Sequence, residues 1–140
     1  MIIVAAAILV VLATISGLHL YWAIGGLWPA RSEEELVKTV IGSVSTSKMP
    51  PQWLTMMVAT MILLAGLVPL AVLSGWLPAW LSAYALTIST AVFLLRGAVS
   101  YVVPSLGRKM SEPFRTLNLR YYSPLCLLLG SGFAMILVFA

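Results

Sequence analysis

The chain has 140 residues, which is enough for one domain. Apolar residues make up 61% and charged residues only 9%, whereas soluble domains carry roughly 25% charged residues. Together with a mean hydropathy of +1.06, this composition excludes a soluble globular protein. A single Cys excludes an internal disulfide and a paired-cysteine redox motif. One His without any Asp cannot build a typical zinc or two-metal site, so we expect neither a metal nor a cofactor.

The first apolar segment, about residues 2–24, is long enough to cross a bilayer, since a span needs about 20 mostly apolar residues. No basic residue precedes it, so we expect a retained span and not a cleaved signal peptide. In the polar connection that follows, Ser32 and Glu35 form the pattern of a capping box. Apolar residues at helical spacing after Glu35 predict a short amphipathic helix on the membrane surface.

Three more segments qualify as spans, at about residues 53–73, 77–99 and 123–139. Between the last two, Ser111-Glu112-Pro113 is typical of a helix start and predicts a second interfacial helix leading into the fourth span. Because the fourth span is short, it either extends upstream past Pro124 or crosses a thinner bilayer. We therefore predict an all-α, polytopic membrane protein. It is one domain, residues 1–140, built as a four-transmembrane-helix bundle with short interfacial helices in its two cytoplasmic loops.

Small residues indicate where the spans pack together. Lipid gives helices no hydrophobic reason to associate, so small side chains must let the backbones approach each other. Ala13 with Gly17 in the first span, and Gly130 with Ala134 in the fourth, are small residues four positions apart. Both pairs are expected at helix contacts.

The distribution of basic residues predicts the orientation of the spans. All Lys and Arg lie in or beside the connections after the first and third spans: Arg31, Lys38, Lys48, Arg96, Arg108, Lys109, Arg115 and Arg120. The turn at residues 74–76 and both termini carry none. The positive-inside rule makes the basic side cytoplasmic. This predicts a multi-pass membrane protein with both termini outside, on the periplasmic or extracellular side.

Arg96 is the one charged residue inside a predicted span, about one turn from its cytoplasmic end. An unpaired Arg at the centre of a span costs about 2.5–3.5 kcal/mol on insertion scales, and no span contains an acidic partner. Two readings stay open. The side chain either snorkels to the lipid headgroups, or it faces the bundle and binds an anionic or carbonyl group.

His19 lies near the cytoplasmic end of the first span, next to Tyr21 and Trp22. An imidazole titrates near neutral pH, which suits acid–base chemistry. The alternative is a His that only hydrogen-bonds across helices. Tyr and Trp at this depth are typical of the aromatic belt at a membrane interface.

Polar and aromatic residues from three spans and their flanks are expected at one depth on the cytoplasmic side. In a bundle they would surround a cytoplasm-facing cavity, and a cavity with few polar groups in apolar walls is a typical ligand site. The candidate ligand-binding residues are His19, Trp22, Arg96, Tyr101, Asn118, Arg120 and Tyr122.

Two sequence blocks carry a resemblance to a known family. They are HLYWAIGGLWP at residues 19–29 and NLRYYSPLC at residues 118–126. Essentially the whole chain resembles a family of small bacterial integral membrane proteins catalogued only as a domain of unknown function. The resemblance implies a four-span bacterial membrane protein, and hence a place in the bacterial inner membrane. It supplies no activity and no catalytic residue.

Three functions fit these observations. The first is a binding module that holds an amphipathic small molecule or lipid, with Arg96 and Arg120 at its anionic end. The second is a membrane enzyme for a lipophilic substrate, with His19 as acid–base catalyst and Tyr122 or Tyr101 as proton donor. The third is an accessory or assembly subunit of a larger membrane complex, and the chain could also partner with further copies of itself in a homo-oligomer. The expected partners are membrane lipids and an amphipathic molecule, and not nucleic acid.

Overall fold

The computed structural model describes all 140 residues as helices and connecting segments, without strands. Four helical runs are long and apolar enough to cross a membrane. Three of them are single α-helices: α1 (Ile2–Ala23), α3 (Gln52–Leu73) and α4 (Ala79–Val102). The fourth runs from Phe114 to Phe139 and has 26 residues. The chain is therefore an all-helical, multi-pass membrane protein, as predicted.

The fourth helix extends upstream of the predicted span. It joins α6 (Phe114–Leu117), the π-helical turn η1 (Asn118–Tyr122) and α7 (Ser123–Phe139) without a break. The segment predicted as a second interfacial helix is thus the first part of the fourth span. At 1.5 Å per residue, the whole run is about 39 Å long, which crosses a bilayer of ordinary thickness.

The third helix also runs further than predicted, to Val102 instead of residue 99. It stops where Val103 takes a non-helical conformation, because a residue before proline is disfavoured in the α region. Pro104 then begins α5 (Pro104–Arg108), a short helix that was not among the predicted elements.

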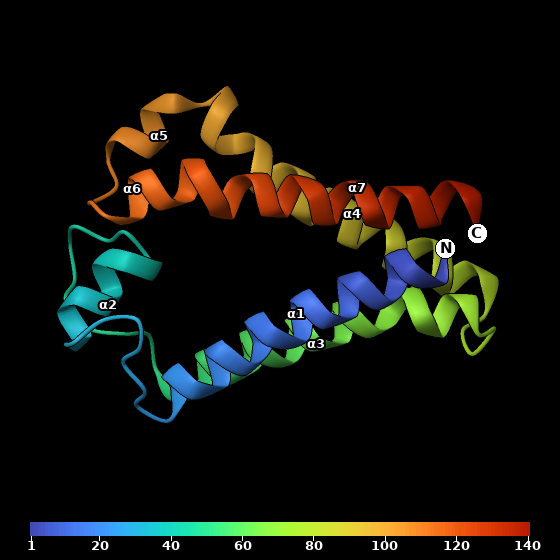
Figure 1. The fold of residues 1–140 in the computed structure, drawn as a ribbon, viewed down its shortest axis with the longest axis horizontal. Coiled ribbons are helices and arrows are strands. Elements are labelled where there is room, and N and C mark those ends of the chain that lie inside the picture. Colours follow the sequence, from blue (N-terminus) through green and yellow to red (C-terminus); the bar gives the residue numbers. More distant parts are fainter.

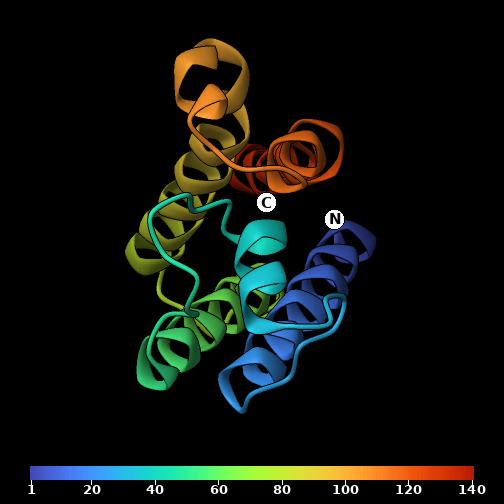
Figure 2. The ribbon, with the colours of Figure 1, turned by 90° about the vertical axis from the view of Figure 1, so that its left-hand side faces the viewer.

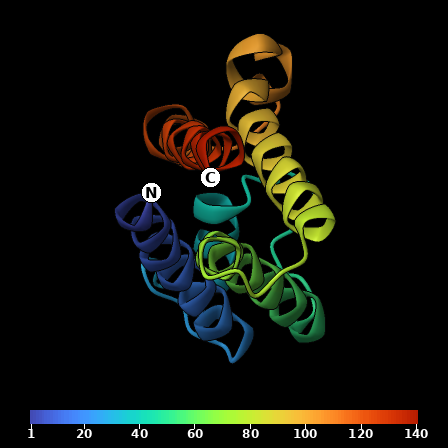
Figure 3. The same ribbon diagram turned by 90° about the vertical axis from the view of Figure 1, so that its right-hand side faces the viewer.

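The long helices form two antiparallel pairs, α1 with α3 and α4 with α7. Figure 1 shows the pairs close together at the end where both termini lie, and Figure 3 looks onto this end. We call it the closed end; it also holds the turn at 74–78. Towards the opposite end, the open end, the pairs separate, and the connections 24–51 and 103–113 lie there (Figure 1).

Glycines let α4 and the fourth helix approach each other. A Cβ atom at Gly97 would lie 2.8 Å from the Ser123 carbonyl oxygen, and one at Gly130 would lie 2.9 Å from the Leu94 backbone nitrogen. Gly130 therefore lies at a helix contact, as predicted. The expectation for Ala13 and Gly17 is wrong, because both residues are exposed and a Cβ at Gly17 would meet no atom within 4 Å.

The hydrophobic core lies towards the closed end, where the two pairs meet. It is a cluster of buried apolar residues from α1, α4 and α7: Ala5, Ile8, Leu12, Leu86, Leu129, Phe133 and Ile136. Phe93 stacks on Phe133 with ring centroids 5.5 Å apart. The core thus joins the pairs at one end and leaves them apart at the other.

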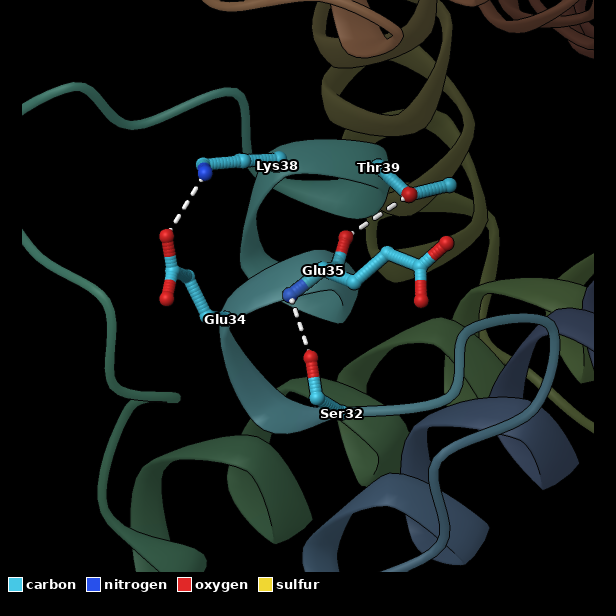
Figure 4. Close-up of polar contacts among 5 residues, drawn as sticks. All are labelled: Ser32, Glu34, Glu35, Lys38 and Thr39. Atoms are coloured by element: carbon cyan, nitrogen blue, oxygen red, sulfur yellow. Dashed lines mark hydrogen bonds and ion pairs between the residues drawn. The ribbon is translucent and has the colours of Figure 1, made fainter.

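The predicted amphipathic helix is present as α2 (Glu33–Val40). The Ser32 hydroxyl caps it by accepting a hydrogen bond from the Glu35 N–H at 3.2 Å, and Lys38 pairs with Glu34 at 2.6 Å (Figure 4). Leu36 and Val37 are fully buried, so part of the apolar face packs inside the protein. Figure 2, which looks onto the open end, shows α2 lying between the two helix pairs.

Candidate functional site

A cavity of about 740 Å³ lies between the two helix pairs towards the open end. Leu12, Phe93 and Leu129 line it on the side of the core, and Val40 and Ile41 at the end of α2 line it as well. Of its 22 lining residues, 17 are hydrophobic. Its volume lies within the range of roughly 300–1,000 Å³ found for small-molecule sites. The separation of the helix pairs therefore leaves space for one small ligand.

Arg96 lines this cavity from α4. Its Nη2 donates a hydrogen bond to the Asn118 side-chain oxygen at 2.8 Å. The molecule contains two ion pairs, Lys38–Glu34 and Arg115–Glu112, and Arg96 takes part in neither. The guanidinium is therefore held by a neutral amide and keeps its full positive charge.

Asn118 is the centre of a buried network between α4 and the fourth helix. Its amide nitrogen donates to the Ser100 hydroxyl at 2.6 Å. The Ser123 hydroxyl lies 3.0 Å from Ser100 Oγ and 3.3 Å from the Asn118 oxygen. All three residues are at least nine-tenths buried. The network fixes the amide that holds Arg96.

Asn118 begins the π-helical turn η1. A π-turn widens the helix locally and leaves backbone groups free for other partners, and such turns occur frequently at functional sites. The Leu119 carbonyl in this turn accepts a hydrogen bond from the Tyr101 hydroxyl at 2.7 Å. The irregular turn is thus fastened to α4 by the side chain of Asn118 and by the backbone carbonyl of Leu119.

His19 lines the cavity from α1. Its Nδ1 lies 2.8 Å from the Ile15 carbonyl oxygen, which accepts only, so Nδ1 carries the hydrogen. Nε2 makes no hydrogen bond within the protein and is an acceptor when the ring is neutral. The ring contacts Trp22, with centroids 5.2 Å apart. The Trp22 indole N–H donates to the Trp28 carbonyl at 2.8 Å.

Comparison with known sequences connects this site to a family. The family described as "Protein of unknown function (DUF3995)" matches residues 12–133 of the chain. The chain belongs to this family. The match includes all the predicted site residues and both sequence blocks that carried the resemblance. No curated protein and no solved structure matches the chain significantly.

The structure brings only some of the predicted site residues to the cavity. His19, Trp22, Arg96 and Tyr122 line it. Asn118 lies behind Arg96 as its hydrogen-bond partner. Tyr101 and Arg120 are exposed and lie outside the lining, and Arg120 makes no side-chain hydrogen bond or ion pair. Arg96 is thus the only one of the two predicted arginines that lines the cavity.

One thiol and one hydroxyl of the cavity wall were not among the predicted site residues. Cys126 lines the wall and is half-buried, and Thr55 lines it from α3. Cys126 follows Tyr122 by four residues, and positions four apart lie on one face of a helix. That spacing is the sequence signal that links Cys126 to the predicted site.

Proposed function

We propose that this integral membrane protein binds an amphipathic molecule or a lipid in the cavity between its helix pairs. The proposal rests on the composition of the wall, which is mostly hydrophobic but includes His19 and Arg96. A ligand with an apolar body and one polar head matches such a wall, because the body leaves water while the head meets hydrogen-bonding partners. The cavity volume of about 740 Å³ suits one drug-sized molecule or one chain of a lipid.

The proposal includes a location and an orientation. We propose that the chain lies in a bacterial inner membrane with its open end in the cytoplasm and both termini outside. The support is the concentration of basic residues in and beside the two connections of the open end, because basic loops are retained on the cytoplasmic side. The cavity would then receive ligands from the cytoplasm or from the inner leaflet.

Native mass spectrometry of the protein, extracted in mild detergent, tests ligand binding. Added dodecylphosphocholine should appear as a complex of one amphiphile per chain. Cys126→Phe places a ring in the cavity and should abolish this complex. Ser131→Phe on the exposed side of α7 is the matched control and should retain it. No complex in the wild type, or equal complexes in both variants, would contradict the proposal.

A membrane enzyme for a lipophilic substrate is the second candidate function, and one observation supports it. His19 Nε2 has no partner within the protein although the ring lines the cavity, which is the state that an acid–base catalyst needs before substrate binds. Tyr122 is less suited as a proton donor, because its hydroxyl already donates to the Thr39 carbonyl at 3.3 Å. Turnover of a lipid or quinone library by wild type, lost in His19→Ala, would favour an enzyme over a binding module.

A further inference from the structure

The charge balance of the cavity indicates what kind of polar head it accepts. Arg96 is the only permanently charged residue in the lining, and a guanidinium stays charged in proteins. A charge beside apolar walls is costly unless another group compensates it. Arg96 would therefore be stabilised by a negatively charged partner.

The carboxylates of the chain do not compensate Arg96. Each of them is engaged with other groups: Glu33 with the Met49 N–H, Glu34 with Lys38, Glu35 with the Arg31 N–H, and Glu112 with Arg115 and Thr116. All lie in the connections of the open end and not in the spans. The protein therefore provides no anion for Arg96.

Asn118 holds Arg96 without neutralising it. Of the five N–H donors of a guanidinium, the structure assigns one to the Asn118 oxygen. The Asn118 amide is itself fixed by Ser100 and Ser123, so the orientation of Arg96 is set before a ligand arrives. The other donors have no partner within the protein.

We infer that the cavity selects an amphipathic anion, whose carboxylate or phosphate binds Arg96 while its chain lies against the apolar wall. This inference rests on the proposed function and names the charge class of its ligand. Asn118 is a positioning residue for this site, because it orients Arg96 and leaves the charge available. The same chemistry occurs in an anionic phospholipid and in a soluble single-chain amphiphile.

The single cysteine provides the readout, since Cys126 lines the same cavity. The full chain is placed in phosphatidylcholine nanodiscs, and the rate of Cys126 alkylation by N-ethylmaleimide is measured. Three probes with one chain length are added: dodecyl phosphate, dodecylphosphocholine and dodecyltrimethylammonium. Dodecyl phosphate should slow alkylation at a concentration about ten- to a hundredfold lower than the zwitterion, the range expected for hydrogen bonds to a charged group. The cation should protect least.

Variants separate the charge of Arg96 from its structural role. Asn118→Asp gives Arg96 a carboxylate partner. It should reduce the preference for dodecyl phosphate over dodecylphosphocholine to about threefold or less. Arg96→Gln removes the charge and should reduce the preference in the same way. It replaces Asn118→Asp as the test if that variant does not fold. Arg96→Lys should restore part of the preference. Arg120→Gln, which removes an exposed Arg outside the cavity, is the matched control and should keep it.

The outcomes separate this inference from the proposed function. Equal protection by all three head groups, or an unchanged preference in folded Asn118→Asp and Arg96→Gln, overturns the anion inference and leaves amphiphile binding standing. No protection by any probe overturns both. Protection when phosphatidylglycerol replaces part of the phosphatidylcholine assigns the anion to a lipid. Protection by added dodecyl phosphate alone assigns it to a soluble amphiphile.

Discussion

The hydroxyl of Ser123 shows how single polar groups join the two halves of the α4–α7 pair. Ser123 is fully buried, and its Oγ lies within hydrogen-bond distance of Ser100 and Asn118. Inside a membrane such interhelical hydrogen bonds stabilise by about 0.6 kcal/mol on average and about 1.7 kcal/mol at most. The network therefore contributes modestly to stability, and its main effect is to fix the position of the Asn118 amide.

Ser123→Ala should lower the free energy of unfolding by about 0.5–1.5 kcal/mol, because the buried network loses one member. The measurement is unfolding of the purified protein in detergent, followed by circular dichroism. Ser131→Ala is the matched control on α7: that hydroxyl is exposed and bonds to the Leu127 carbonyl of its own helix. Equal effects of the two substitutions would show that the network does not link the helices.

The sequence predicts how deep in the membrane each candidate site residue lies, but it predicts only in part which way each side chain points. Distance along a span places His19, Arg96 and Tyr122 near one end. Direction follows from the helical angle of about 100° per residue, which turns Tyr101 about 140° away from Arg96. Tyr101 accordingly lies outside the cavity lining. The Arg96–Asn118 hydrogen bond depends on the packing of two helices and on a π-turn, and the sequence shows neither.

At the scale of elements, α2 is docked on the fourth helix at the open end. The Gly42 carbonyl accepts a hydrogen bond from the Ser111 N–H at 3.0 Å, and the Tyr122 hydroxyl donates to the Thr39 carbonyl. A Cβ at Gly42 would lie 2.4 Å from the Phe114 ring, and Gly42 has a φ of +73°. Only glycine fits this position, because its backbone is left-handed and its surroundings are full.

Gly42→Ala should loosen α2 and increase the reaction of Cys126 with a charged, membrane-impermeant thiol reagent severalfold. The left-handed backbone alone costs about 1–2 kcal/mol, and the displaced Phe114 ring adds to it. Gly75→Ala is the matched control, since Gly75 has a φ of +69° but open space around it and lies at the closed end. A comparable increase in Gly75→Ala would contradict a specific role for the α2 contact.

The start of the fourth helix depends on an exposed carboxylate. Glu112 accepts hydrogen bonds from the Thr116 hydroxyl at 2.9 Å and its N–H at 3.2 Å, and pairs with Arg115 at 2.8 Å. The hydrogen bonds of Thr116, followed by Arg115, hold the pKa of Glu112 below its usual range. A lowered folded-state pKa means that this stabilisation is present above the unfolded pKa and is lost as the pH falls through the folded one.

Amide exchange at Thr116, corrected for the intrinsic effect of pH, should therefore stay slow near neutral pH. It should quicken at acidic pH, as the pH falls through the lowered pKa of Glu112 and the carboxylate becomes protonated. Glu112→Gln removes the titration and should show no such step. Hydrogen-exchange mass spectrometry of the segment 112–118 measures the effect. A step that persists in Glu112→Gln would assign it to another group.

Elements that depend on nearby residues in the sequence were predictable. Elements that depend on packing against other helices were not. The Ser32 cap and the four apolar stretches are local, and the structure confirms both. The short helix at Pro104 and the unbroken fourth helix depend on how the open end packs. Gly17 and Gly130 have similar sequence contexts, yet only Gly130 contacts another helix, because the rotation of each helix is decided by its partner.

For the whole molecule, the two ends differ in charge, and both carry exposed aromatic residues. The basic residues lie in or beside the connections of the open end, whereas the turn of the closed end contains none. Aromatic residues are exposed towards both ends: Trp28, Trp53 and Tyr121 at the open end, and Trp76 and Trp80 at the closed end. Two such belts are typical of the two interfaces of a membrane. The charge difference between the two ends supports the proposed orientation.

The orientation is testable with single cysteines in a Cys126→Ser background. Ser47→Cys lies in the open-end connection and Ser74→Cys in the closed-end turn, and both positions are exposed. In intact bacterial cells expressing these variants, an impermeant maleimide should label Ser74→Cys and spare Ser47→Cys, because basic loops are retained in the cytoplasm. Permeabilised cells should label both. The reverse pattern would place the cavity opening outside, and labelling of both in intact cells would contradict a single orientation.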